Sequence, residues 1–149
     1  MFPGVSLDTN IVAYAEGIDG SSRQVQALEL LSRLPRNTLN ISIQVVGELY
    51  NVLTKRGVSR EHARERSLYW KQFLTVLETS GELMETAVDL ATEHRMRVWD
   101  ALILAAAAEA RCDLLLSEDF QDGFAWRGVT VVNPFAEKPH KMLTKLLRG

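Results

Sequence analysis

The sequence of 149 residues predicts an α/β fold with a mostly parallel central sheet. Short apolar segments with strand character alternate with longer segments of helical spacing along the chain. One short segment, Leu114–Leu116, is apolar at every position, which is typical of a strand covered on both faces of a parallel sheet. Hydrophobic residues make up 46% of the chain and charged residues 24%, and the length fits one domain over residues 1–149.

The first expected strand is Val5–Leu7. A short helix follows, and we expect Thr9 or Asn10 to be its N-cap, because short polar side chains accept hydrogen bonds from the free amide groups of a first turn. Residues 17–20, which begin and end with glycine, predict a loop.

Ser21 or Ser22 is expected to cap the next helix, which runs to about residue 34. Its apolar residues at helical spacing are Val25, Leu28, Leu31 and Leu34. A second strand is expected over residues 38–41. Ser42 can then cap a helix to about Lys55 that ends at Gly57, and Ser59 can cap a further helix to about residue 73.

The rest of the chain continues the alternation. The expected elements are a β-rich stretch over 75–79, helices over 82–94 and 99–110, strands over 114–116 and 129–132, and a short helix over 139–147. Crossovers between parallel strands are right-handed, and ligands bind such sheets outside the carboxyl ends of the strands. The residues that follow the strands are therefore the first candidates for chemistry.

Composition and charge narrow the function classes. The net charge of −2 lacks the overall basic excess that usually marks nucleic-acid binding. Basic residues do gather locally, and a basic rim around an acidic centre or ordinary solvated helix faces both explain them. The longest apolar run, residues 101–108, is far too short to span a membrane, and Cys112 is the only cysteine. With no signal peptide visible, we expect a cytoplasmic protein.

Two acids lie at the carboxyl ends of expected strands. Asp8 comes after Val5–Leu7, and Asp119 comes three residues after Leu114–Leu116. Since the carboxyl ends of parallel strands meet at the same edge of a sheet, we expect these two carboxylates to lie at one edge.

Two further acids lie on expected helices. Asp100 is three residues before Ile103 and seven before Ala107, which places it on the apolar stripe formed by Ile103, Ala106, Ala107 and Ala110. A carboxylate there needs a partner or a cation, unless Asp100 is simply the N-cap of the helix. Glu48 lies at the edge of the apolar stripe of its own helix, and a glutamate that merely reaches solvent is the alternative.

Convergence of the four acids predicts a divalent metal site, because their mutual repulsion must be offset by positive charge. Mg²⁺ and Mn²⁺ prefer oxygen ligands, and Mg²⁺ typically uses one or two protein carboxylates and keeps several waters. Zinc is disfavoured because the three histidines are scattered along the chain. No glycine-rich phosphate loop or serine nucleophile motif is visible.

Four short motifs, in order and spacing, resemble the PIN-domain nucleases. They are Leu7-Asp8-Thr9-Asn10, Ser42 with Gly47-Glu48-Leu49, Trp99-Asp100-Ala101-Leu102-Ile103, and Leu116-Ser117-Glu118-Asp119. The segment Val131-Val132-Asn133-Pro134-Phe135 is similar to the chain ending of the bacterial VapC-like toxins. The resemblance runs from about Val5 to Phe135.

The resemblance implies a three-layer α/β/α sandwich and a Mg²⁺- or Mn²⁺-dependent endoribonuclease. It implies that Asp8, Asp100 and Asp119 are metal ligands and that Glu48 helps to hold a second metal site or a water. Ser117 would hydrogen-bond the last acid, and Thr9 and Asn10 would orient the first. VapC-like members are toxins, most of them homodimers, that a cognate antitoxin inhibits. With the resemblance, metal-activated water is expected to hydrolyse the RNA phosphodiester. Arginines near the groove, Arg56, Arg60 or Arg97, would position the RNA backbone rather than read its sequence.

Other functions remain open from the sequence. A haloacid-dehalogenase phosphatase would need a second aspartate where Asn10 stands, and a response-regulator receiver would need a lysine late in the sheet, which residues 129–132 do not supply. A housekeeping RNA-processing nuclease of the PIN type and a catalytically inactive RNA-binding PIN domain are the alternatives within the family.

Overall fold

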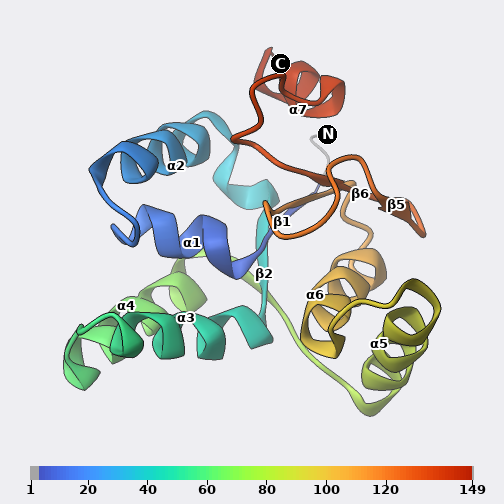
Figure 1. Cartoon of the computed structure of the whole chain (residues 1–149), viewed down its shortest axis with the longest axis horizontal. Helices are drawn as coiled ribbons and strands as arrows, with labels where there is room; N and C mark the ends of the chain where they lie inside the picture. Colours follow the sequence, from blue (N-terminus) through green and yellow to red (C-terminus); the bar gives the residue numbers. More distant parts are fainter. Residues whose placement is uncertain (1–3, 149) are drawn as a thin grey trace.

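In the computed structural model, which describes residues 4–148, six strands form one sheet in the order β3-β2-β1-β4-β6-β5 (Figure 1). The strands are β1 (Val5–Leu7), β2 (Leu39–Ser42), β3 (Thr75–Leu77), β4 (Leu114–Leu116), β5 (Ala125–Trp126) and β6 (Val129–Val132). Every pairing from β3 to β6 is parallel, and only the edge strand β5 runs antiparallel to its neighbour. The predicted α/β class with a mostly parallel sheet is therefore confirmed.

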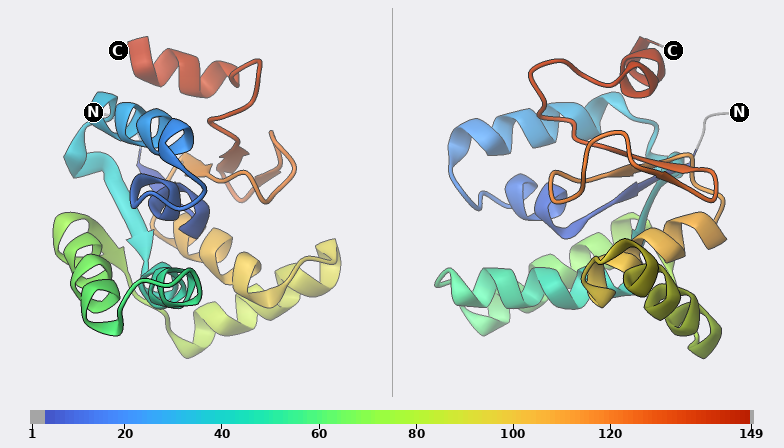
Figure 2. Two further views of the ribbon diagram at one scale, coloured as in Figure 1. Left: turned by 60° about the vertical axis from the view of Figure 1, so that its left-hand side comes forward. Right: turned by 45° about the vertical axis from the view of Figure 1, so that its right-hand side comes forward.

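Helices cover both faces of this sheet. They are α1 (Thr9–Ala15), α2 (Ser21–Arg33), α3 (Ile43–Lys55), α4 (Arg60–Phe73), α5 (Gly81–His94), α6 (Val98–Glu109) and α7 (Lys141–Arg148), with a 3₁₀ turn, η1 (Arg36–Thr38), before β2. The helices α2 and α7 lie on one side of the sheet and α3 to α6 on the other (Figure 2). This is the expected α/β/α sandwich. Within residues 4–148, no helix is both long and apolar enough to cross a membrane.

The core runs through the sheet into helices on both of its faces, and β1, β4 and α6 are its most continuously buried elements. All residues of β1 and β4 are buried, as are the seven consecutive residues Ala101–Ala107 of α6. The sheet and α5 cover α6 from different sides. The small alanine side chains of α6 allow both to pack close to this helix. The predicted stripe on this helix was too narrow, and its last member, Ala110, is exposed.

Two predicted helix starts were wrong. Asp8, not Thr9 or Asn10, is the N-cap of α1, and it accepts a hydrogen bond of 2.7 Å from the Thr9 amide. Gly20 is the N-cap of α2 with φ of +100°, so neither Ser21 nor Ser22 caps that helix. The predicted caps of α3 and α4 are confirmed: Ser42 accepts from the Gln44 amide and Ser59 from the His62 amide.

The predicted buried face of α2 was also wrong in part. Val25 and Leu28 are 62% and 47% exposed, and the helix instead buries Ala27 and Leu30, with Leu34 just beyond its end. Residues spaced strictly by three drift around a helix of 3.6 residues per turn, so the four predicted positions spiral across half of its surface. The second strand starts at Leu39 rather than at residue 38, because η1 takes up residues 36–38. The two-residue strand β5 was not predicted.

The caps give a direct test of these assignments. We expect Ser59→Ala to lower the free energy of unfolding by about 1 kcal/mol, because the first turn of α4 loses an acceptor for one of its free amides. Ser21→Ala, which removes a hydroxyl from the first turn of α2 without removing a cap, should change it by less than about 0.5 kcal/mol. Urea unfolding of both variants measures the difference, and equal losses would contradict the assignment.

Candidate active site

Two neighbouring strands bring Asp8 and Ser117 together. In the parallel pair β1 and β4, Leu7 lies opposite Leu116, so the residues that follow them meet at the carboxyl edge. The Ser117 hydroxyl donates to Asp8 Oδ2 over 2.6 Å, and the Thr9 amide donates to Oδ1 over 2.7 Å. Asp8 is only 2% exposed. The fold therefore holds a carboxylate at a fixed position under the sheet edge.

Burial raises the pKa of Asp8 to about 7. The hydrogen bonds from Ser117 and Thr9 lower the pKa, and the negative charges of Asp119 and Asp100 raise it again. The two donors therefore only partly offset the loss of water. A nearby cation would restore the charged form, so the site suits one.

Asp119 is exposed beside this pair, and its amide donates to the Ser117 hydroxyl oxygen over 3.1 Å. The Ser117 hydroxyl uses its one hydrogen in the bond to Asp8. Its oxygen therefore acts only as an acceptor toward the Asp119 amide and toward Asn10 Nδ2, which lies 3.4 Å away. This arrangement leaves the buried Asn10 Oδ1 without a hydrogen-bond partner. A buried acceptor oxygen without a partner, on a side chain that contacts Ser117, suits a bound water.

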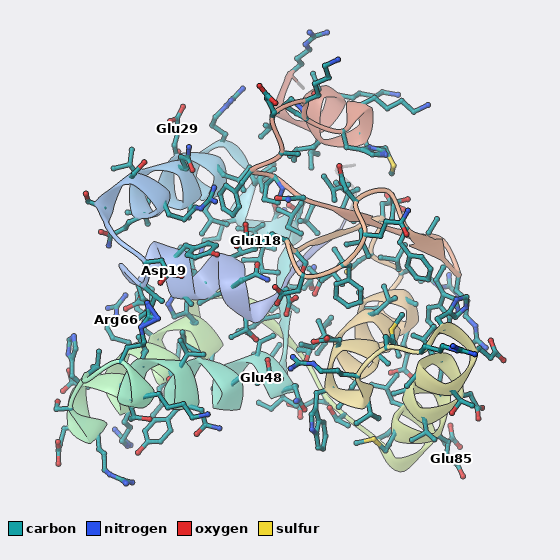
Figure 3. The ribbon with its side chains drawn as sticks, viewed as in Figure 1. Asp19, Glu29, Glu48, Arg66, Glu85 and Glu118 are labelled. Carbon is teal, nitrogen blue, oxygen red and sulfur yellow. The ribbon has the colours of Figure 1, made fainter. Side chains whose placement is uncertain are left out.

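Glu48 is held in place rather than reaching freely into solvent. It lies in the second turn of α3, half-buried, and Figure 3 shows it near the start of that helix. The Thr9 hydroxyl donates to its Oε2 over 2.5 Å, and Gln44 Nε2 donates to Oε1 over 2.9 Å. Thr9 thus links the first two acids, with its amide on Asp8 and its hydroxyl on Glu48.

Asp100 is the third residue of α6 and not its N-cap, because Arg97 occupies the cap position. Its side chain is 18% exposed, and it accepts from Arg97 Nε over 3.2 Å and from Nη2 over 3.4 Å. The helix N-terminus stabilises the negative charge. Of the predicted acids, Asp100 is the one that already has a cationic partner.

A groove of about 470 Å³ opens beside the acids. It is lined by Thr9, Asn10, Ala13, Tyr14, Ile18, Asp19, Glu48, Asn51, Val52, Lys55, Arg56, Arg97 and Asp119. Lys55 lies seven residues after Glu48 on α3, about 10 Å along the helix, and the neighbouring Arg56 forms an ion pair with Asp19. The groove is therefore acidic at one part and basic at another.

The donor set fits Mg²⁺ or Mn²⁺. As the side chains are placed, no group of three Asp, Glu, His or Cys side chains among residues 4–148 forms a cage that could hold a metal ion. Mg²⁺ does not require one, because it binds through one or two carboxylates and keeps several waters. Asp8 with its unmet charge, the nearby Asp119 and the unpaired Asn10 oxygen offer such an open, all-oxygen environment.

One acid at this edge was missed by the sequence reasoning. Glu118 accepts a hydrogen bond from the Tyr14 hydroxyl, and Arg23 lies 3.8 Å from it. Burial, then the bond to Glu118, raises the pKa of Tyr14 to about 12. The position of Glu118, directly after β4 and Ser117, is the signal that could have identified it.

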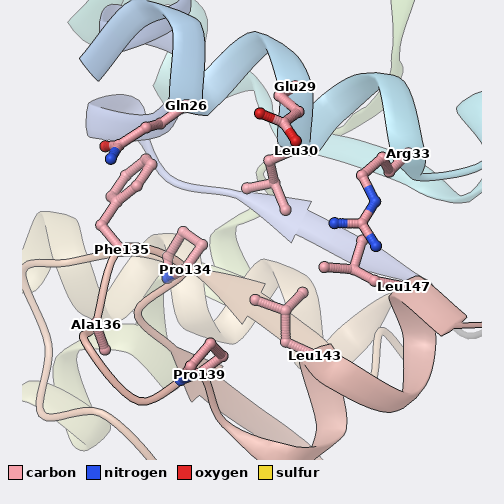
Figure 4. Close-up of a pocket in the computed structure, with 10 residues that line it drawn as sticks. All are labelled: Gln26, Glu29, Leu30, Arg33, Pro134, Phe135, Ala136, Pro139, Leu143 and Leu147. Atoms are coloured by element: carbon pink, nitrogen blue, oxygen red, sulfur yellow. The ribbon is translucent and has the colours of Figure 1, made fainter. Parts of the chain in front are cut away.

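A second hollow lies between α2 and α7 and is unlike the groove (Figure 4). Its volume is about 300 Å³, most of its lining is apolar or proline, and Glu29 is the one carboxylate among the lining residues drawn. Nothing in this lining provides the donor set of a reaction site.

Comparison with known proteins gives a family and several structural neighbours. The model of the PIN domain family matches residues 5–124. No curated protein matches the chain. Among solved structures, VapC20 of Mycobacterium tuberculosis, described as a toxin that cleaves the sarcin–ricin loop, is 20% identical with a TM-score of 0.66, over 75% of this chain and 87% of that one.

Two further neighbours come from toxin–antitoxin complexes. A chain of such a complex from Klebsiella pneumoniae is 24% identical with a TM-score of 0.68, over 89% of this chain and 98% of that one. A chain of VapBC2 from Rickettsia felis, bound to a DNA fragment of its promoter, is 25% identical with a TM-score of 0.57, over 77% and 86% of the two chains.

The buried carboxylate of Asp8 predicts that the stability of the metal-free protein, kept so by a chelator, depends on pH. Because the pKa of Asp8 is about 7 when folded and near 3.8 when unfolded, the folded protein binds the extra proton. Stability should therefore fall as pH rises from about 4 to 7 and level off above. Across this pH range, the free energy of unfolding of the wild type should fall by roughly 2 to 4 kcal/mol more than that of Asp8→Asn. Urea unfolding at a series of pH values measures it, and parallel curves for the two proteins would show that Asp8 titrates normally.

Proposed function

The chain belongs to the PIN domain family, and on this basis we propose that it is a Mg²⁺- or Mn²⁺-dependent endoribonuclease, the toxin of a toxin–antitoxin pair. The observation that carries the proposal is the buried carboxylate of Asp8, which has two neutral donors, acidic neighbours and an open groove beside it. The structural neighbours from toxin–antitoxin complexes support the toxin role.

In this proposal Asp8, Asp100 and Asp119 hold the ion, and Glu48 holds a second ion or a water. A divalent ion bound there would lower the pKa of an attacking water and neutralise charge on the phosphodiester. Ser117 and the Thr9 amide fix the Asp8 carboxylate, so its position does not depend on substrate.

The remaining residues of the groove position the substrate. Asn10 Oδ1 has no hydrogen-bond partner among the described residues and would accept a hydrogen bond from a water bound in the site. Lys55 and Arg56 line the groove away from the acids and would contact phosphates of the RNA backbone rather than read its sequence. Such contacts orient the strand across the acidic part of the groove.

The same proposal includes two protein partners and a cytoplasmic location. A cognate antitoxin would cover the acidic groove, and a second copy of the chain would form a homodimer. The exposed Val25 and Leu28 on α2 provide apolar surface for a protein contact.

Cleavage should depend on each proposed ligand. We expect Asp8→Asn, Asp100→Asn and Asp119→Asn each to reduce the cleavage of total RNA by about 100-fold or more, since each removes a charge that holds the ion. Asp89→Asn, a matched change at an exposed position of α5, should retain activity. Chelation should stop cleavage and added Mn²⁺ should restore it.

Fragment-end sequencing of the products locates the cut sites. Full activity of the Asp100→Asn protein would show that Asp100 only stabilises the start of its helix. Cleavage that survives chelation would exclude the metal mechanism.

The toxin role has its own test. Induced expression in a bacterial host should arrest growth, and co-expression of the small reading frame that neighbours the gene should relieve the arrest. The Asp119→Asn protein should not arrest growth. A chain that cleaves RNA in vitro and leaves growth unchanged would instead be a housekeeping processing nuclease.

A further inference from the structure

Among residues 4–148, Arg97 is the cation whose guanidinium contacts one of the proposed metal ligands. It occupies the N-cap position of α6 but makes no side-chain capping bond. Its guanidinium instead contacts both oxygens of Asp100, at 3.2 and 3.4 Å, and it lines the groove together with Glu48 and Asp119. The side chain therefore faces three of the four acids.

The hold on Arg97 is electrostatic. Its side chain is 78% exposed, so little packing fixes it. The hydrogen bond to Asp100 raises the pKa of Arg97, and the charges of Asp100, Asp119 and Glu48 raise it further. Arg56, which also lines the groove, is instead paired with Asp19. Arg97 thus supplies positive charge where the acids need it, on a side chain free to swing away.

We propose that Arg97 is a built-in counter-ion that competes with the divalent ion for the carboxylates of Asp100, Asp119 and Glu48. Once displaced from Asp100, its guanidinium binds a phosphate oxygen of the RNA. This inference rests on the proposed function. A divalent ion held by Asp100 would repel the guanidinium and would neutralise the carboxylates in its place. The released guanidinium is planar with paired N–H donors, which match phosphate oxygens.

A merely structural Arg97 would predict something different. An exposed pair three residues apart in a helix stabilises the helix start by a few tenths of a kcal/mol at most. Removing such a pair would leave metal affinity unchanged. A counter-ion, in contrast, opposes metal binding and assists substrate binding, so its removal moves these two quantities in opposite directions.

The first experiment measures Mn²⁺ binding without RNA, by isothermal titration calorimetry on the full chain. We expect Arg97→Gln to bind Mn²⁺ about threefold to tenfold more tightly than wild type, as one positive charge is removed a few ångströms from a divalent ion in a water-exposed site. Arg97→Lys keeps the charge and should stay within about twofold of wild type. Arg56→Gln, which removes the same charge from another part of the groove, should also stay within about twofold.

The second experiment measures RNA cleavage at saturating Mn²⁺. Arg97→Gln should cleave RNA at least about tenfold more slowly than wild type despite its tighter metal binding. Arg97→Lys should lie between the two, because a lysine keeps the charge but lacks the paired N–H donors of a guanidinium. Far-UV circular dichroism checks that the variants fold, and Arg97→Met serves as a second neutral variant.

The outcomes separate the two proposals. If wild type binds Mn²⁺ and cleaves RNA but Arg97→Gln and Arg97→Met bind Mn²⁺ as wild type does, the counter-ion role is wrong and the proposed function stands. If both neutral variants bind Mn²⁺ more tightly yet cleave as fast as wild type, the phosphate role is wrong. If wild type neither binds Mn²⁺ nor cleaves RNA, the proposed function fails and this inference fails with it.

Discussion

The site depends on the position of one carboxylate at the end of the strand β1, where almost no water reaches it. Two parallel neighbours flank β1, so the residue that follows the strand is enclosed by the sheet edge. Asp8 occupies that place, caps α1 and accepts hydrogen bonds from the Thr9 amide and the Ser117 hydroxyl. These bonds satisfy both oxygens but bring no positive charge, and burial still raises its pKa to about 7. The fold therefore maintains a local need for a cation.

A comparison with Glu16 shows why this need indicates function. Glu16 is also a largely buried acid, at the C-cap of α1, but Arg66 donates to both of its oxygens over 2.7 and 2.8 Å, and Trp70 Nε1 donates a third bond. A guanidinium fork supplies both hydrogen bonds and charge, so Glu16 joins α1 to α4 and needs nothing further. Asp8 has the bonds without the charge. A complete ion pair stabilises the fold, whereas an incomplete one leaves room for a ligand.

The sequence was sufficient to predict the strands of the parallel sheet, both serine caps on α3 and α4, and the four acids as candidates. It could not identify the cap of α1, because Asp8 was interpreted as a ligand and one side chain fills both roles. It misjudged α2, because equal spacing by three drifts around a helix and only the packed structure shows that Ala27 and Leu30 face inward. Glu118 was missed for a similar reason: adjacent acids look alike in a sequence, and their hydrogen-bond partners, Ser117 for the Asp119 amide and Tyr14 for Glu118, distinguish them only after folding.

The four acids differ in how firmly the fold fixes them, and this difference bears on how an ion can enter. Asp8 is buried at a strand end, and Glu48 is held on α3 by two hydrogen bonds, so neither can move far. Asp119 is exposed on the segment after β4, and Asp100 is partnered by an exposed arginine. In the proposed function, two firmly held carboxylates and two less constrained ones would suit a hydrated ion that exchanges some of its waters for carboxylate oxygens and keeps the rest. A rigid cage of four carboxylates would repel itself in the absence of metal, so the open arrangement is the one that a stable metal-free fold can maintain.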